Sequence, residues 1–366
     1  MNTNLHETFL KLVRLGIGHT ESTDNTEIKK LSCAEWGQLK ALAEEQGLSA
    51  IVLDGLNTDG MDLTDTMPLE MKLEWIGEVL QGESVYAHQR AVAVDVANLF
   101  YHNAIRTYVL KGNVISECYQ KPNHRVSVDI DCFLLPNKGD FDAWSLGNDL
   151  IRAKGFIVNT DFYKNSSFDI SGVYIENHQY MTPFRGNARL TSFEKLLQNY
   201  LRQDKGEDVF EGTHLYRPPV LVTALFLIEH SYSHFLHEGL TWRHVLDWML
   251  FSKKHHDDIN WVEFDAFVDE FGFRKFYDVF SRLCQYLIGD VQEFNSLSVQ
   301  EKRMLDDIWA PLDIHETVRG WKGKLALAGN TWRARWKYSY FTGMSWITAL
   351  GIQVKGFLFE KNPKLN

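Results

Sequence analysis

The amino-acid sequence predicts an α+β fold in which a small sheet is flanked by large N-terminal and C-terminal helical regions. Apolar residues recur at helical spacing up to about residue 105 and again from Thr191 onward. Between these regions lie short runs of β-branched and aromatic residues bounded by Gly, Pro and Asn. We therefore divide the chain into a helical N-terminal region (1–105), a core that contains the strands (106–203) and a helical C-terminal region (204–366).

Length and composition exclude several classes of protein. The 366 residues are 45% hydrophobic and 23% charged, which is ordinary for a globular chain of two or three domains. The net charge of -10 argues against a general nucleic-acid-binding protein, because phosphate affinity comes from clustered Lys and Arg. The four cysteines form no CxxC pair, which favours a reducing cytoplasm. We expect a cytoplasmic protein without a signal peptide or a transmembrane segment.

The N-terminal region (1–105) is expected to be a helical scaffold without catalytic residues. An amphipathic helix is predicted near the N-terminus, and a second one over 34–46. Gly47 is expected to end the second helix as its C-cap. Longer helices are predicted over 69–80 and 86–106.

Two aspartates on one predicted strand form the first candidate site. Residues 128–135 (VDIDCFLL) are predicted to be a buried strand apart from Asp129 and Asp131. Because side chains alternate along a strand, both carboxylates share one face. Neighbouring anions repel each other and resist losing their water, and a divalent cation offsets both effects. The alternative is a solvated edge strand, which often carries charge.

A turn ahead of this strand is a candidate phosphate site. The short strand 107–110 ends at Lys111 and Gly112, and a helix is predicted over 114–119. Free backbone N–H groups at a helix N-terminus favour an anion, and the lysine adds a cation. A tight turn with a surface lysine would have the same sequence. The loop that follows brings Arg125 close to the two aspartates.

Glu176 is the candidate third carboxylate. Residues 156–162 and 168–179 are predicted to form a strand pair joined by a turn at 164–167. Alternation along the second strand places Glu176 and His178 on one face. The alternative is the exposed polar face of a hairpin.

The C-terminal region begins with a polar segment, 204–219, which is the expected linker. The helix predicted over 219–236 carries His230 and His234 at the i, i+4 spacing that zinc can use. An HExxH motif is absent, and we expect a structural or substrate-facing role for both histidines. A hydrogen bond from one of them to Asp247 on the next helix is the more economical arrangement.

A basic, Trp-rich stretch lies near the C-terminus. Between Arg319 and Phe359 there are seven Lys or Arg residues, no Asp or Glu, and four interleaved tryptophans. Such a stretch could receive phosphates, RNA or an anionic membrane surface. A helix pair with a basic outer face and a Trp-rich inner face is the favoured interpretation, and this patch is the expected partner surface outside the core.

Together these segments resemble the polymerase-beta-like nucleotidyltransferase fold, and their order is similar to that of the bacterial uncharacterised nucleotidyltransferase family. The resemblance covers about residues 5–255. The segments that carry it are Ala34-Glu35-Trp36, Val109-Leu110-Lys111-Gly112, Arg125 ahead of Asp129 and Asp131, the strand with His178, Leu227-Ile228-Glu229-His230 with His234, and Trp242-Arg243 to Asp247.

The resemblance implies a small mixed sheet and transfer of a nucleoside monophosphate from an NTP to an acceptor hydroxyl, with release of pyrophosphate. It implies that Asp129 and Asp131 hold Mg²⁺ or Mn²⁺, with Glu176 or His178 as the third ligand. The residues expected to bind the nucleotide are Lys111, Gly112, Asn113 and Arg125. Those expected to face the substrate or support the site are His178, His230, His234, Arg243 and Asp247.

Asn113 departs from the pattern of the superfamily, in which the turn glycine is normally followed by Gly or Ser. The loop from Gly112 to Asp129 is also somewhat long. These departures motivate an alternative, a catalytically inactive module that binds a nucleotide or a partner. The acceptor could be a small molecule, a protein or an RNA.

Overall fold

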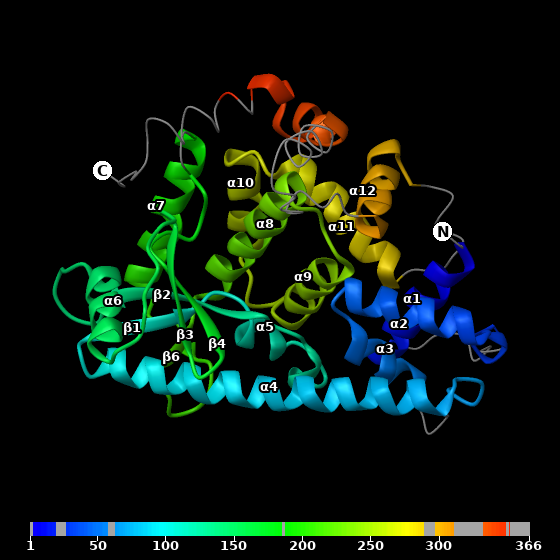
Figure 1. Ribbon diagram of the computed structural model, residues 1–366. Helices are drawn as coiled ribbons and strands as arrows, with labels where there is room; N and C mark the ends of the chain where they lie inside the picture. Colours follow the sequence, from blue (N-terminus) through cyan, green and yellow to red (C-terminus); the bar gives the residue numbers. More distant parts are fainter. Residues whose placement is uncertain are drawn as a thin grey trace, which may run out of the picture.

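A six-stranded mixed sheet with helices around it forms the computed structural model of the chain (Figure 1). This arrangement confirms the predicted α+β class. The structure describes residues 3–19, 27–57, 63–184, 187–288, 297–310, 332–348 and 351.

The N-terminal helices are α1 (Thr3–Gly16), α2 (Cys33–Glu45), α3 (Ser49–Leu56) and α4 (Leu69–Tyr101). Helices α1 and α3 pack with their backbones in contact, which is possible because Gly55 has no side chain. A Cβ atom there would lie 2.0 Å from the carbonyl oxygen of Leu12. Gln46 is the C-cap of α2, and the predicted Gly47 follows it with φ of 66°, so the helix ends at this glycine but one residue later than the cap itself.

Helix α4 is one continuous helix of 33 residues, where the sequence predicted two. The intervening Gln81-Gly82-Glu83-Ser84-Val85 contains no proline, and glycine lowers helix stability without ending the helix. In Figure 1, α4 runs beneath both the sheet and the N-terminal helices. It therefore connects the scaffold to the core.

The strands are β1 (Ile105–Val109), β2 (Asp129–Pro136), β3 (Asn165–Ile170), β4 (Val173–His178), β5 (Glu207–Asp208) and β6 (Leu215–Arg217), in the order β3-β4-β2-β1-β6-β5. Strand β2 is antiparallel to β1 and parallel to β4. Strand β6 pairs in parallel with β1, so the expected linker 204–219 contributes two strands to the sheet. The linker prediction was wrong because short strands leave little periodicity in a sequence.

The β3–β4 hairpin differs from the prediction in its turn. The turn is at Ser171 and Gly172, with φ of 56° and 82°, rather than at 164–167. Successive positive φ angles are typical of a two-residue hairpin turn. The predicted strand 156–162 forms only an isolated bridge, at Asn159.

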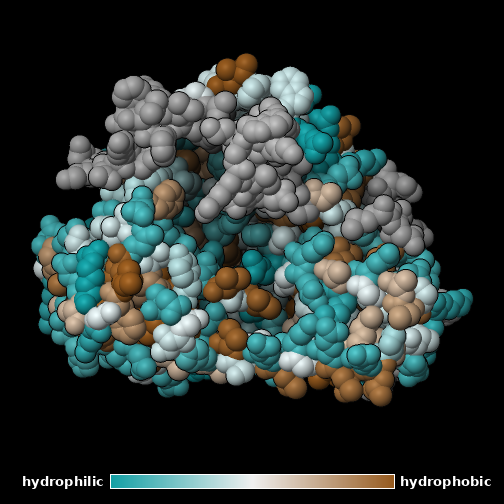
Figure 2. Space-filling model, in the orientation of Figure 1, coloured by the Kyte–Doolittle hydropathy of each residue, from teal (hydrophilic) through white to brown (hydrophobic). Residues whose placement is uncertain are grey.

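The remaining helices are α5 (Asn113–Ser116), α6 (Ala143–Ala153), α7 (Ala188–Gln203), α8 (Val220–His237), α9 (Trp242–Lys254), α10 (Trp261–Glu270), α11 (Arg274–Ile288) and α12 (Val299–Trp309). Helices α8 and α10 lie on the side of the molecule opposite α4 (Figure 1). The face seen in Figure 2 is mainly hydrophilic, with apolar side chains in small groups. Among the described residues, no helix combines the length and the apolar character that crossing a membrane requires.

Most of the basic, Trp-rich stretch lies outside the described residues. Within 332–348, Arg333 and Arg335 are exposed, as an outer basic face requires, but Trp332 is exposed as well, where a Trp-rich inner face was predicted. Lys337 is instead buried against α8 and α12. Lys337 therefore belongs to the core and not to the predicted outer face.

Candidate active site

Parallel pairing of β2 with β4 brings two carboxylates and an imidazole together. Asp131 lies beside Glu176 in the register, and His178 follows on the same face. His178 Nε2 lies 2.9 Å from Asp131 Oδ1 and 3.4 Å from Glu176 Oε2. One ligand atom from each of the three residues lies within 4.8 Å of the others, so one cation can contact all three.

Asp129 and Asp131 have opposite electrostatic environments. Burial opposes ionisation of Asp131, but Lys111 Nζ at 3.1 Å and His178 outweigh it and hold the pKa of this carboxyl well below its usual range. Burial and the charge of Asp131 raise the pKa of Asp129. Asp131 therefore carries a compensated charge, and Asp129 is the carboxylate whose ionisation an added cation would favour.

The donor set fits a hard divalent cation. His178 Nδ1 lies 3.2 Å from the carbonyl oxygen of Tyr180, to which it can only donate, so Nε2 faces the carboxylates. Burial opposes a charge on this ring, but hydrogen bonds to Asp131 and Glu176 raise the pKa of His178. Carboxylate oxygens are the ligands that Mg²⁺ and Mn²⁺ prefer, and a cation bound by Asp131 and Glu176 would displace the proton from His178 Nε2.

The Lys111–Gly112 turn is closely packed against the start of β2. Gly112 has φ of 60°, and a Cβ atom there would lie 3.3 Å from Ser127 Oγ and 3.9 Å from the carbonyl oxygen of Asp129. The helix predicted over 114–119 is a single turn, α5, which begins at the buried Asn113. The turn therefore sets Lys111 beside the aspartates, while α5 is too short to carry a substantial dipole.

Arg125 and Asp247 form a buried two-point ion pair. Arg125 Nε and Nη2 lie 2.8 and 2.7 Å from the two carboxylate oxygens of Asp247, and the Tyr119 hydroxyl donates to Asp247 Oδ1 at 2.7 Å. The expected histidine hydrogen bond to Asp247 was wrong, because a planar guanidinium satisfies both oxygens at once. Arg243 donates to the carbonyl oxygen of Val126 and holds the same loop.

A cavity of about 530 Å³ joins these groups to α8 and α9. Its volume lies within the range of small-ligand sites. The predicted site residues that line it are Lys111, Arg125, Asp129, His230, His234, Arg243 and Asp247. Asp129 thus connects the carboxylate cluster with the cavity.

Sequence reasoning missed His244, which also lines this cavity beside His230 and His234. The three imidazoles converge because α9 folds back against α8, an arrangement without a local signature. The available signal was Thr241-Trp242-Arg243-His244, in which the histidine completes the N-terminal cap of α9.

Over most of its length the chain matches one protein-family model. The family model described as "Uncharacterised nucleotidyltransferase" matches residues 32–289. No curated protein matches the chain, and no solved structure does. The matched range contains the sheet, the carboxylate cluster and the cavity.

Proposed function

Because the chain belongs to the uncharacterised nucleotidyltransferase family, we propose that it is a metal-dependent enzyme that moves a nucleoside monophosphate from an NTP to an acceptor hydroxyl. The observation that carries this proposal is the convergence of Asp131, Glu176 and His178 within 4.8 Å, with Lys111 against Asp131. Two-metal phosphoryl transfer requires such a cluster next to a cavity that admits the nucleotide.

Asp129, Asp131 and Glu176 would hold Mg²⁺ or Mn²⁺, with His178 as the alternative to Glu176. A bound divalent ion supplies charge stabilisation for the phosphate oxygens and the entering acceptor oxygen. The pairing of β2 with β4 supports this role, because neighbouring strands of one sheet hold their side chains in fixed relative positions.

Lys111 would bind the triphosphate from the floor of the cavity. Its ammonium group is paired with Asp131, 3.1 Å away, and can turn to phosphate oxygens when the carboxylate gains another cation. Gly112 and Asn113 would contribute backbone N–H groups. Arg125, fixed by Asp247, would add a stationary positive charge where pyrophosphate departs.

Glu176 would receive the proton of the acceptor hydroxyl. Its side chain is 27% exposed, against 4% for Asp131, so an incoming acceptor can reach it. The acceptor oxygen forms a bond to the α-phosphorus, and the bond from that phosphorus to the pyrophosphate oxygen breaks. The products are the nucleotidylated acceptor, pyrophosphate and the proton held by Glu176.

The proposal is tested by release of pyrophosphate from labelled NTPs with Mg²⁺ or Mn²⁺. We expect Asp129→Asn and Asp131→Asn to lower the rate by about 10²–10³-fold, because charge stabilisation of the transferring phosphate is lost. Asp95→Asn, at an exposed position on α4, is the matched control and should retain the rate.

Equal rates in the wild type and both site variants would contradict the proposal, as would unchanged Mg-ATP affinity in Asp129→Ala. The identity of the acceptor is tested separately, with a small molecule, a protein and an RNA offered in turn. An RNA acceptor would show affinity that falls steeply with salt.

A nucleotide-binding or partner-binding module without turnover is the second candidate. Asn113, in place of the Gly or Ser of the superfamily, favours it, and this residue is buried beneath the turn. Two results together would assign the chain to this class. The protein would bind NTP in a way that depends on Asp129, and it would release no pyrophosphate with any of the four NTPs and any acceptor offered.

A further inference from the structure

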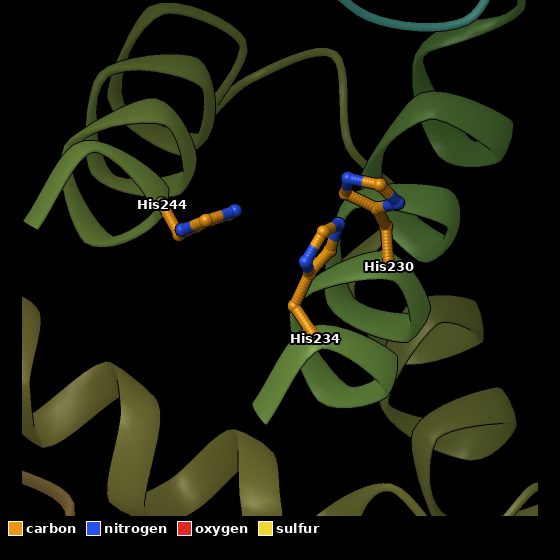
Figure 3. Close-up of side chains that lie close together, drawn as sticks. All are labelled: His230, His234 and His244. Carbon is orange, nitrogen blue, oxygen red and sulfur yellow. The ribbon is translucent and has the colours of Figure 1, made fainter. Parts of the chain in front are cut away.

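Three histidines from two helices face one another at the wall of the cavity. His230 and His234 project from α8, and the ring of His244 extends toward them from α9 (Figure 3). The ring centroids of His230 and His234 are 4.4 Å apart, and those of His234 and His244 are 5.0 Å apart. One nitrogen from each ring lies within 4.8 Å of the others.

We propose that His230, His234 and His244 form a binding site for a transition-metal ion of the zinc class, separate from the carboxylate site. Nitrogen donors select Zn²⁺, Co²⁺ or Ni²⁺, whereas Mg²⁺ prefers oxygen. Two histidines at i, i+4 on one helix plus a third from a neighbouring helix supply the three protein ligands of an open zinc site.

Glu238 orients the first ligand. His234 Nδ1 lies 2.8 Å from Glu238 Oε2, and a ring nitrogen next to a carboxylate donates its proton to it. The lone pair of His234 is therefore on Nε2. A carboxylate that holds the outer nitrogen of a histidine in this way is a regular feature of zinc sites.

Thr241 orients the third ligand. His244 Nδ1 lies 3.1 Å from the backbone nitrogen of Thr241 and 3.0 Å from its Oγ1. The Thr241 N–H donates to Nδ1 in this structure, so binding of a metal at Nε2 requires Nδ1 to take up the proton and to donate it to Oγ1 instead. The N-terminal cap of α9 thus offers Nδ1 a donor when it is unprotonated and an acceptor when it carries the proton.

The charge state of the cluster favours a metal over an anion. Glu238 Oε2 lies 2.8 Å from His234 Nδ1, and this carboxylate would repel an anion held by the rings. Neutral imidazole is the form that binds a metal, whereas an anion site would need imidazolium.

Three nitrogen ligands leave a fourth position open toward the cavity. Lys111 and Asp129 line the same cavity, so a ligand of the metal would lie in the space that the nucleotide and its acceptor share. The chemical class suited to that position is an oxygen or sulfur donor, such as a hydroxyl, carboxylate or thiol. Metal binding by the histidines does not depend on whether nucleotidyl transfer takes place.

Titration of the full chain with Co²⁺ tests the site through its visible absorption. The measurement is made on the wild type and on Asp131→Asn, which disables the carboxylate cluster. We expect the intense visible band of both proteins to saturate at one Co²⁺, because Co²⁺ at oxygen ligands absorbs only weakly, and we expect His234→Gln and His244→Gln to lose the band. Glu238→Gln should keep the band but weaken Co²⁺ affinity by about 10- to 100-fold.

His256→Gln, at an exposed position beyond α9, is the matched control and should bind Co²⁺ as the wild type does. Far-ultraviolet circular dichroism confirms that each variant is folded. A band that survives in His244→Gln, or one lost only in Asp131→Asn, would overturn the proposal. So would unchanged Co²⁺ binding together with weakened inorganic pyrophosphate binding in the histidine variants, since the cluster would then be an anion site.

Discussion

At the scale of single residues, Asp131 depends on Lys111 for its buried charge. The two side chains form an ion pair 3.1 Å long, and Asp131 is 4% exposed. Removing one partner of a buried pair leaves the other charge without compensation, which costs more than the pair itself contributes. Lys111 therefore acts on stability as well as on any bound phosphate.

We expect Lys111→Met to lower the free energy of unfolding by about 3 kcal/mol in metal-free buffer. Added Mn²⁺ should recover part of this loss, because a cation at the carboxylates replaces the missing ammonium group. Urea denaturation with and without Mn²⁺ measures both effects. Lys253→Met, at an exposed position on α9, is the control and should have the stability of the wild type with and without Mn²⁺. If Mn²⁺ left the stability of Lys111→Met unchanged, the proposed cation site would be contradicted.

The backbone conformation at position 112 requires glycine. With φ of 60° and a Cβ atom 3.3 Å from Ser127 Oγ, Gly112→Ala should lower the free energy of unfolding by about 1–3 kcal/mol. Gly77→Ala is the opposite control, because Gly77 lies within α4 with no atom near its Cβ position. It should raise stability by about 0.5–1 kcal/mol. Equal effects at the two glycines, measured by urea denaturation, would remove the special role of the turn.

At the scale of elements, the 3₁₀ turn η3 (Pro122–His124) connects the N-terminal scaffold to the loop that holds Arg125. His124 Nδ1 lies 2.6 Å from Asp54 Oδ2 on α3, and His124 Nε2 lies 2.8 Å from Glu83 Oε1 on α4. A ring with a carboxylate at each nitrogen is stable as imidazolium. The site loop is thereby attached to two scaffold helices through one side chain.

Burial opposes the charge of His124, but the hydrogen bonds to Asp54 and Glu83 raise its pKa above 6.5. A group whose pKa is raised on folding stabilises fully below its unfolded pKa, and this stability is lost as pH rises through the folded pKa. We therefore expect His124→Gln to destabilise the protein more at pH 6 than at pH 9. Urea denaturation at both pH values checks this, with His88→Gln on α4 as the control.

A difference between wild type and His124→Gln that stays constant from pH 6 to pH 9 would show that the ring acts without its charge. A pH dependence of equal size in His88→Gln would instead assign the effect to the protein as a whole.

At the scale of the whole molecule, Lys337 fastens the C-terminal part of the chain to the helical core. Its Nζ lies 2.7 Å from Asp307 Oδ2 on α12 and 2.8 Å from the carbonyl oxygen of Phe235 on α8. Burial lowers the pKa of Lys337 and raises that of Asp307, and each group partly offsets this for the other. Two distant helices thus share one buried cation.

We expect Lys337→Met to lower the free energy of unfolding by about 3–5 kcal/mol, because Asp307 would remain buried without its partner. The double variant Lys337→Met/Asp307→Leu should recover most of the loss, since an apolar pair of similar size needs no compensation. A double-mutant cycle in urea provides the measurement. Additive losses in the two single variants would show that the ion pair is unimportant.

Much of the candidate site could be predicted from local spacing. Alternation along a strand was enough to place Asp129 and Asp131 on the same face of one strand, and Glu176 and His178 on the same face of another strand. The i, i+4 rule was enough to align His230 and His234. These predictions succeeded because side-chain direction within one element depends only on its backbone geometry.

The meeting of these groups was decided by tertiary structure. The parallel register of β2 and β4 sets Asp131 beside Glu176, and the return of α9 against α8 brings His244 to the other histidines. Strands β5 and β6 belong to the sheet, although the segment that contains them, 204–219, has the composition of a linker. Which distant segments pair depends on the free energy of the whole fold. Such pairing leaves no hydrophobic periodicity in the sequence of either segment that could reveal its partner.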